Sequence, residues 1–441
     1  MNSYDSARMA DILAPFGFIM SDRPDDADMI ILTTCHIREK ASEKLFSDLG
    51  RLRSLKEARR ASGGMLILVV AGCVAQANGA ALLERAPYVD IVLGTQSYYR
   101  LPEIVLQKEK KILEIDFPQE SKFHHLPPPT ANGIAVFLPV QEGCDKFCTF
   151  CVVPYTRGAE YSRPVAAVLA DASDLVATGA KEITLLGQNV NTYRGMSPDG
   201  TDSWGLGRLL QALARIDGLY RLRFITSHPR DIDDELIEAF QKLPQLMPYL
   251  HLPIQSGSDR ILAAMNRGHT VSYYYKLVDK LRNTHPKIAL SSDFIVGFPG
   301  ETEADFTATL DLVQRVGYAQ AYAFKFSPRP GTPAAQAPDQ IPEVVKADRL
   351  ARLQNLLSTQ QRFFNTVFLG REVPVLLDRR GTQAGQMIGR SPYMQVVTVR
   401  APDYFLGQIV NLRIDRIRSN SLDGTLVNFD SIQHEHTINK C

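Results

Sequence analysis

A strand followed by a helix recurs along the sequence from residue 134 to about residue 327, and this repeat limits the possible folds more than any other feature. Apolar runs of strand type alternate with longer amphipathic segments of helical period. The strands are expected at residues 134–142, 182–188, 221–226, 249–255, 288–297 and 321–327. Because strand–helix–strand connections are right-handed, these units predict an open, partial (β/α)6 barrel whose functional residues gather at the carboxyl ends of its strands.

Two differently patterned regions flank this repeat. Residues 1–120 alternate helix and strand and predict a doubly wound α/β domain, although its first helix has no strand before it. A proline-rich linker is expected at residues 121–133, and the barrel domain at residues 134–365. Residues 371–436 change to short β-runs, which predict a small β-barrel. The fold class is therefore α/β with a small all-β domain at the end.

The composition is that of an ordinary globular enzyme. The 441 residues carry a net charge of +1, so any surface for nucleic acid must be local. No signal peptide or membrane-length apolar run is visible, and we expect a cytoplasmic protein without a membrane partner. Five of the six cysteines lie in short motifs, which favours metal ligation over a disulfide framework.

Three cysteines in the spacing C-x3-C-x2-C are the strongest chemical signal. Cys144, Cys148 and Cys151 supply three thiolates, whereas a structural zinc site or an electron-transfer 4Fe-4S cluster uses four protein ligands. Three thiolates on a four-iron cluster leave one iron open. That iron can chelate S-adenosylmethionine and reduce its sulfonium to release a 5′-deoxyadenosyl radical. The alternatives are a three-ligand zinc site and a chance group of core cysteines.

Two further cysteines occupy matching places in the first region. Cys35 and Cys73 each follow a predicted strand at its carboxyl end, which is where ligands bind in open α/β sheets. Each could ligate metal or act as a small buried apolar residue.

Polar turns after the barrel strands are candidate contacts for S-adenosylmethionine. Gln188 and Asn189 follow the second strand, Ser256 follows the fourth and Gly297 follows the fifth. Their amides, hydroxyl and bare backbone suit the methionyl and adenine ends of the cofactor. Ordinary turn formation explains each of them as well. Weaker candidates are Arg157, Ser227, His228 and Arg329.

Arginine is the basic residue of the last region. Residues 373–430 contain seven arginines and no lysine. Guanidinium groups suit phosphate and base stacking, so this region is expected to bind RNA, with a plain capping β-domain as the alternative.

Several motifs together resemble the methylthiotransferases of the radical S-adenosylmethionine superfamily. The closest resemblance is to the group that modifies N6-isopentenyladenosine in tRNA. The matching motifs lie at residues 2–6, 35–41, 72–76, 143–158, 186–191, 251–269, 294–301, 327–333 and 389–393.

The resemblance implies a fold and a chemistry. The three regions would be a methylthiotransferase domain, a radical barrel and an RNA-binding TRAM barrel. Cys144, Cys148 and Cys151 would hold the radical-generating 4Fe-4S cluster. Cys35 and Cys73 would be two of three ligands of an auxiliary 4Fe-4S cluster that carries the transferred sulfur. Two molecules of S-adenosylmethionine would be used, with tRNA and a reducing electron donor protein as partners of a monomeric enzyme.

One departure from the family pattern concerns the amino terminus. The family's first auxiliary ligand lies in a Cys-Gln-Met-Asn motif, and Met1-Asn2 is only the tail of that motif. We expect a start codon placed too late, with a truncated enzyme that cleaves S-adenosylmethionine but hardly inserts sulfur as the rival. Alternative functions are methylthiolation of threonylcarbamoyladenosine in tRNA, methylthiolation of a ribosomal-protein aspartate, and non-catalytic RNA binding.

Overall fold

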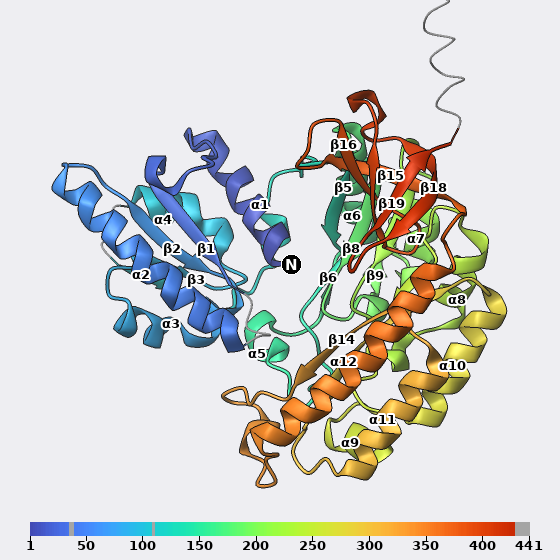
Figure 1. Cartoon of the computed structure of the whole chain (residues 1–441). Helices are drawn as coiled ribbons and strands as arrows, with labels where there is room; N and C mark the ends of the chain where they lie inside the picture. The colour runs from blue at the N-terminus through green and yellow to red at the C-terminus, as the bar shows by residue number, and fades with distance from the viewer. Residues whose placement is uncertain (35–38, 108–110, 428–441) are drawn as a thin grey trace, which may run out of the picture. The chain divides into compact units, whose positions relative to one another are not determined.

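The computed structural model describes residues 1–34, 39–107 and 111–427, except for the side chains of residues 39–42. The chain divides into two compact units, coloured along the sequence in Figure 1. The first comprises residues 1–130, 141–162 and 327–335, and the second comprises the remaining residues. Cys35 and Cys441 lie outside the described residues. Among the helices of the described residues, none is long and apolar enough to cross a membrane.

The first unit is built on a four-stranded parallel sheet. Its strands are β1 (Met29–Thr33), β2 (Ile67–Ala71), β3 (Ile91–Leu93) and β4 (Ile112–Glu114), in the order β1-β2-β3-β4. The helices are α1 (Asn2–Leu13), α2 (Glu39–Ala61), α3 (Cys73–Arg85) and α4 (Leu101–Leu106).

Alternate side chains of β2 explain why helices cover both faces of this sheet. Val69 packs in a buried cluster with residues of α1 and α4, while its neighbour Val70 packs with residues of α2 and α3. Successive strand side chains point to opposite faces, so both faces need a cover. Figure 1 shows these helix pairs on the two sides of the sheet. The predicted doubly wound α/β domain is confirmed.

The segment 141–162 also belongs to the first unit. Its two ends pair as antiparallel strands β6 (Gln141–Glu142) and β7 (Tyr161–Ser162), and the short helix α5 (Val153–Arg157) lies between them. The three-cysteine loop therefore packs with the amino-terminal sheet in one compact unit.

The second unit contains the repeated strands of the barrel. They form two three-stranded parallel sheets, β5-β8-β11 and β12-β13-β14, which are linked where Leu222 of β11 bridges Leu246. The strands are β5 (Ala135–Pro139), β8 (Glu182–Leu186), β11 (Arg221–Phe224), β12 (Tyr249–His251), β13 (Ala289–Val296) and β14 (Gln320–Lys325). The order along the sheet follows the order along the chain, and the predicted partial barrel is confirmed.

Helices connect these strands in sequence. They are α6 (Val165–Ala177), α7 (Leu206–Leu213), α8 (Asp234–Lys242), α9 (Asp259–Ala264), α10 (Val271–Thr284), α11 (Glu303–Val316) and α12 (Glu343–Thr366). Two small hairpin strands, β9 (Gly195–Met196) and β10 (Ser203–Trp204), precede α7. The predicted break near Gly268 is the gap between α9 and α10. A single large apolar cluster fills the space between these helices and the two sheets.

The chain continues from α12 into a closed β-barrel. Its strands are β15 (Glu372–Arg380), β16 (Gln386–Arg390), β17 (Val396–Arg400), β18 (Ile409–Ile417) and β19 (Leu422–Leu426), in the order β15-β16-β17-β19-β18. Closure leaves no strand edge unpaired, and the barrel has its own apolar core.

Two buried arginines of β11 bind the β-barrel to the sheet. Arg221 donates to the carbonyl oxygens of Arg390 (2.6 Å) and Pro374 (2.8 Å), and Arg223 donates to those of Pro392 and Ser391, both at 2.8 Å. Burial lowers the pKa of Arg221 to about 10, and the nearby carboxylate of Glu182 opposes this shift.

We expect Arg223→Lys to weaken this attachment. A lysine keeps the charge but loses the planar fork that reaches two carbonyl oxygens, and the free energy of unfolding should fall by about 2–3 kcal/mol in urea titrations. Arg418→Lys is the matched control, because Arg418 is exposed and pairs with Asp423 at 2.7 Å, which is worth at most about 1 kcal/mol. Equal effects of the two substitutions would contradict this role of Arg223.

Candidate functional site

The three predicted cysteines are free thiols on the loop between β6 and α5. Cys148 is buried, and Cys144 and Cys151 are partly buried. Cys144 N–H donates to Gly158 O (3.3 Å), Cys151 N–H donates to Cys148 O (2.9 Å), and Val153 N–H donates to Cys151 Sγ (3.5 Å). Backbone hydrogen bonds thus fix the path of the loop, and one of them reaches a sulfur directly.

A glycine lets the two ends of the loop touch. Gly143 has φ +80°, and a Cβ at this position would lie 2.0 Å from Ala159 O. We expect Gly143→Ala to displace the cysteine loop from this contact. Iron bound per chain after reconstitution should fall by more than half, while circular dichroism stays unchanged. The control is Gly133→Ala, where the Cβ meets no atom within 4 Å although φ is +142°. Iron content equal to that of the unsubstituted chain would contradict the contact.

The Cys144 thiol has little contact with solvent, and this affects its protonation. Burial raises the pKa of Cys144 to about 11, and the neighbouring Cys148 adds to this, while the Lys146 backbone N–H opposes it. Without a metal, the Cys144 thiol is therefore protonated near neutral pH. A metal ion that displaces the proton supplies the positive charge that stabilises the buried thiolate.

Cys73 opens helix α3, directly after β2. It is a partly buried free thiol, and its predecessor Gly72 has φ +95°. The Arg157 guanidinium is close enough for the two groups to interact electrostatically. Cys35, the other predicted ligand of this region, lies outside the described residues, so the predicted pair is not tested.

A cluster of four buried charges lies between the cysteine loop and the amino-terminal helix. Arg157 donates to Glu142 Oε1 (2.6 Å) and Asp5 Oδ2 (2.8 Å). Lys122 donates to the same Glu142 oxygen (2.8 Å) and to Asp5 Oδ1 (3.3 Å). All four side chains are at most 4% exposed. We call these residues the four-charge cluster.

The four-charge cluster was only partly visible in the sequence, where Arg157 was a weak candidate, Asp5 lay in the matching motif at residues 2–6, and Lys122 and Glu142 were not singled out. Burial alone would disfavour its charges. The pKa of Arg157 nevertheless lies well above its usual value because of Asp5 and Glu142, and the pKa of Asp5 lies below its usual value because of Arg157 and Lys122. Asp5 and Arg157 therefore stay ionised.

The predicted contacts after β8 belong to the second unit. Asn189 is buried and donates from Nδ2 to Asp231 Oδ2 (2.9 Å). Asn191 exchanges two hydrogen bonds with the backbone of His228, at 2.8 and 2.9 Å. These amides join the turn after β8 to the turn after β11, while Gln188 remains partly exposed.

Ser256 is fully buried in a tight turn. Its Oγ accepts from Ser258 N–H (3.2 Å) and lies 3.5 Å from Thr309 Oγ1 of α11. A Cβ on Gly257 would lie 2.4 Å from Ala308 O, so helix and turn are in direct contact.

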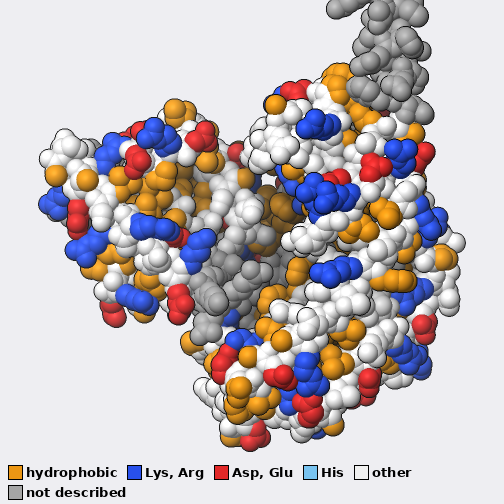
Figure 2. Space-filling model, viewed as in Figure 1, with side chains coloured by type: hydrophobic (Ala, Val, Ile, Leu, Met, Phe, Trp, Pro, Cys, Tyr) orange, Lys and Arg blue, Asp and Glu red, His pale blue; other side chains and the backbone are white. Residues whose placement is uncertain are grey.

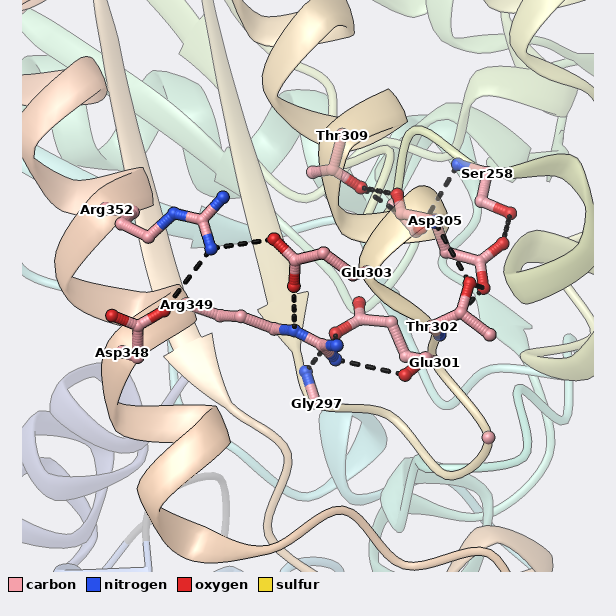
Figure 3. A network of polar contacts seen from close by, with 12 residues as sticks. Ser258, Gly297, Glu301, Thr302, Glu303, Asp305, Thr309, Asp348, Arg349 and Arg352 are labelled. Carbon is pink, nitrogen blue, oxygen red and sulfur yellow. Dashed lines mark hydrogen bonds and ion pairs between the residues drawn. The ribbon is translucent and has the colours of Figure 1, made fainter.

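Gly297 lies in a polar network that Figure 3 shows around the loop after β13. Its φ is +69°, and its N–H donates to Glu301 Oε2 (2.7 Å). The same carboxylate oxygen accepts from Arg349 Nη1 of α12 (2.8 Å), and both side chains of this pair are at most 6% exposed. Burial raises the pKa of Glu301, although the Gly297 N–H and Arg349 favour its ionised form.

The predicted site residues thus fall into two groups. Cys73, Cys144, Cys148 and Cys151 belong to the first unit, and Gln188, Asn189, Ser256 and Gly297 belong to the second. Among the described residues, no three His, Cys, Asp or Glu side chains are grouped so as to hold one metal ion.

Three segments of the chain match known protein families. Residues 1–94 match "Uncharacterized protein family UPF0004", residues 138–313 match the "Radical SAM superfamily" and residues 366–427 match the "TRAM domain". Domains in this combination and order are those of the radical S-adenosylmethionine methylthiotransferases. The chain belongs to this family.

Solved structures of other radical enzymes share the fold. The chain is 15% identical to TsrM, a radical S-adenosylmethionine methyltransferase from Kitasatospora setae solved with cobalamin and a [4Fe-4S] cluster, with a TM-score of 0.56 over 76% of this chain and 74% of that one. TsrM with tryptophan and a cofactor analogue gives a TM-score of 0.57, at 15% identity over 76% and 72%. At these identities the likeness concerns the fold.

The donors of this methylthiotransferase fit an iron–sulfur cluster. Three free thiols lie on one loop, and one of the sulfurs accepts a hydrogen bond from a backbone N–H. Each thiolate of such a cluster binds a different iron, so the three sulfurs need not converge on one ion. The predicted domain limits overlap the matched segments and stay a prediction, as do the roles of the individual site residues.

Proposed function

We propose that this methylthiotransferase modifies tRNA and attaches a methylthio group to C2 of N6-isopentenyladenosine beside the anticodon. The observation that carries the proposal is the three-cysteine loop, because free thiols at Cys144, Cys148 and Cys151 lie inside the segment that matches the radical superfamily. The TRAM match at residues 366–427 supports an RNA substrate. A base in an RNA loop can be unstacked and reached by an enzyme at modest cost.

The proposed cofactors are S-adenosylmethionine and two 4Fe-4S clusters. Cys144, Cys148 and Cys151 would hold the radical-generating cluster, and Cys35 and Cys73 would contribute to the auxiliary one. When bound, the first cluster supplies the electron that breaks the sulfonium bond of S-adenosylmethionine.

The protein residues would hold the cofactor and exclude water. Gln188 is partly exposed, and its proposed role is to contact the methionyl group. Gly297 is buried, and a Cβ there would lie 2.4 Å from Lys346 Cγ, so its proposed role is to let the loop after β13 pack closely beside the cofactor. Asn189 and Ser256 are engaged within the protein, so their proposed part is to hold the two turns in place.

The mixed surface charge is consistent with RNA binding at a limited area rather than over an extended basic surface. On the face seen in Figure 2, Lys and Arg side chains are interspersed with Asp and Glu over the second unit. A substrate RNA would therefore be recognised by particular contacts in addition to phosphate attraction. The proposed partners are tRNA and a reducing electron donor protein, and the proposed enzyme is a cytoplasmic monomer.

Mass spectrometry of tRNA nucleosides tests the proposal. Loss of the methylthio group from isopentenyladenosine is expected in a deletion strain, and the unsubstituted gene should restore it while Cys148→Ala should not. Loss from threonylcarbamoyladenosine, or from a ribosomal-protein aspartate, would overturn the assigned substrate. Restoration by Cys148→Ala would overturn radical chemistry and favour a non-catalytic RNA-binding role.

A further inference from the structure

A pocket of about 330 Å³ lies within the second unit, between the barrel sheet, helix α12 and the β-barrel. Its walls come from β12 and β14, from the last turns of α12, and from the loops between β16 and β17 and between β18 and β19. This volume is within the range of small-ligand sites, which begins at roughly 300 Å³. None of the residues proposed above for the cofactors lines it.

Five of the residues that line this pocket carry a side-chain amide. Asn365 Oδ1 accepts from Gln395 Nε2 (2.7 Å), and Tyr249 OH donates to Gln320 Oε1 (3.4 Å). Hydrogen bonds to the side-chain amides of Gln361 and Asn420 are absent from the described part of the chain. An amide offers a donor and an acceptor side by side, which matches the edge of a nucleobase. The pocket amides are those of Gln320, Gln361, Asn365, Gln395 and Asn420.

Aromatic rings supply flat faces beside these amides. Tyr249 is a buried lining residue, and Phe364 meets Tyr393 edge to face at 6.0 Å between ring centroids. Tyr322 is 43% exposed, and its ring lies 6.4 Å from that of His251. Exposed rings of this kind stack on unpaired bases irrespective of sequence.

The charge of the lining favours a phosphate-bearing ligand. Arg390 is the one formally charged side chain among the described lining residues, and the lining contains no carboxylate. The nearest carboxylate to its Nε is that of Asp378, at 3.8 Å, which leaves the guanidinium without a close bidentate partner. His251 is already engaged by Ser291 Oγ (2.8 Å) and Asp293 Oδ2 (3.3 Å).

We infer that this pocket binds one unpaired nucleotide of the substrate RNA loop. The base stacks on Tyr322 and hydrogen-bonds to the free amides of Gln361 and Asn420, and the phosphate lies toward Arg390. The inference rests on the proposed function, because it takes RNA as the substrate, and it adds a recognition site to which both the radical core and the β-barrel contribute.

Binding of a hairpin RNA with an anticodon-type loop tests the inference. We expect Tyr322→Ala to weaken binding roughly tenfold or more without changing its salt dependence, since a stacking contact is lost. Gln361→Ala should weaken binding severalfold. Arg390→Gln should weaken binding and reduce the slope of log affinity against log salt by about one, as expected for one lost phosphate contact. 2-Aminopurine placed in turn at each loop position should report one base whose fluorescence change on binding requires Tyr322.

Two surface substitutions of the same β-barrel serve as controls. Arg380→Gln removes an exposed arginine that pairs with Asp403 at 2.9 Å, and Gln408→Ala removes an amide that bonds to Tyr404 O; neither residue lines the pocket. Pocket variants that bind the hairpin as the unsubstituted protein does would overturn the inference while leaving the proposed function in place. An unsubstituted protein that binds no RNA would overturn both. Release of deoxyadenosine without RNA should be equal in all variants.

Discussion

Cys148→Ala is expected to reduce cleavage of S-adenosylmethionine to the background of a protein-free mixture. Cys148 is the most buried of the three thiols, and its backbone carbonyl accepts from Cys151 N–H at 2.9 Å. Alanine fills nearly the same space, so the loop should keep its path. Two thiolates remain, and they cannot retain a four-iron cluster that already lacks a fourth protein ligand. Deoxyadenosine formed with dithionite under anaerobic conditions is the measurement.

Cys73→Ala is the matched control for this prediction. Cys73 is also a partly buried free thiol of the first unit, but it lies on α3 rather than on the loop. Under the proposed assignment this variant loses auxiliary-cluster iron and methylthio transfer but still forms deoxyadenosine. Full deoxyadenosine formation by Cys148→Ala, or its loss in Cys73→Ala alone, would contradict the assignment of the two cysteine groups.

The elements of the barrel could be predicted from sequence because each rests on local periodicity. The strand ends were less accurate. The fourth strand was expected at residues 249–255 but ends at His251, and Pro253 lacks the N–H that would continue a ladder. Beyond it Gln255 has φ +80° and makes an isolated bridge to Phe294. An isolated bridge that follows a break in a strand produces no alternating pattern of apolar residues in the sequence, so it could not be predicted.

Side-chain partners far apart in the chain could not be predicted. Asp5 and Arg157 are separated by 152 positions and still share a hydrogen bond. Asn189 was interpreted as a cofactor contact because it follows a strand, but its amide donates to Asp231 on another turn. Spacing identifies the loop on which a polar residue lies, whereas its partner depends on tertiary packing. The cysteine spacing was informative because its ligands are close in sequence.

Arg157→Met is expected to destabilise the first unit by about 3–5 kcal/mol, which is typical when one partner of a buried ion pair is removed. Methionine keeps the apolar volume but leaves Asp5 and Glu142 with Lys122 as the remaining cation of the four-charge cluster. The second oxygen of Glu142 is buried without a hydrogen bond among the described residues, so no spare donor is available. The loss of stability is measured by calorimetric or urea unfolding of the full chain. The first unit is expected to unfold in a separate transition, at lower temperature or lower urea concentration than the second.

A double-mutant cycle separates this role from a general packing effect. Asp5→Asn removes one of the charges that Arg157 compensates, so the double variant should be more stable than the sum of the single losses, by about 1–3 kcal/mol. Arg53→Met is the control, because Arg53 pairs with Glu57 at 2.8 Å on the exposed face of α2, where an ion pair adds little to stability. Strict additivity of the two substitutions would show that the buried charges do not act together, and the four-charge cluster would then have no part in holding the cysteine loop on the amino-terminal sheet.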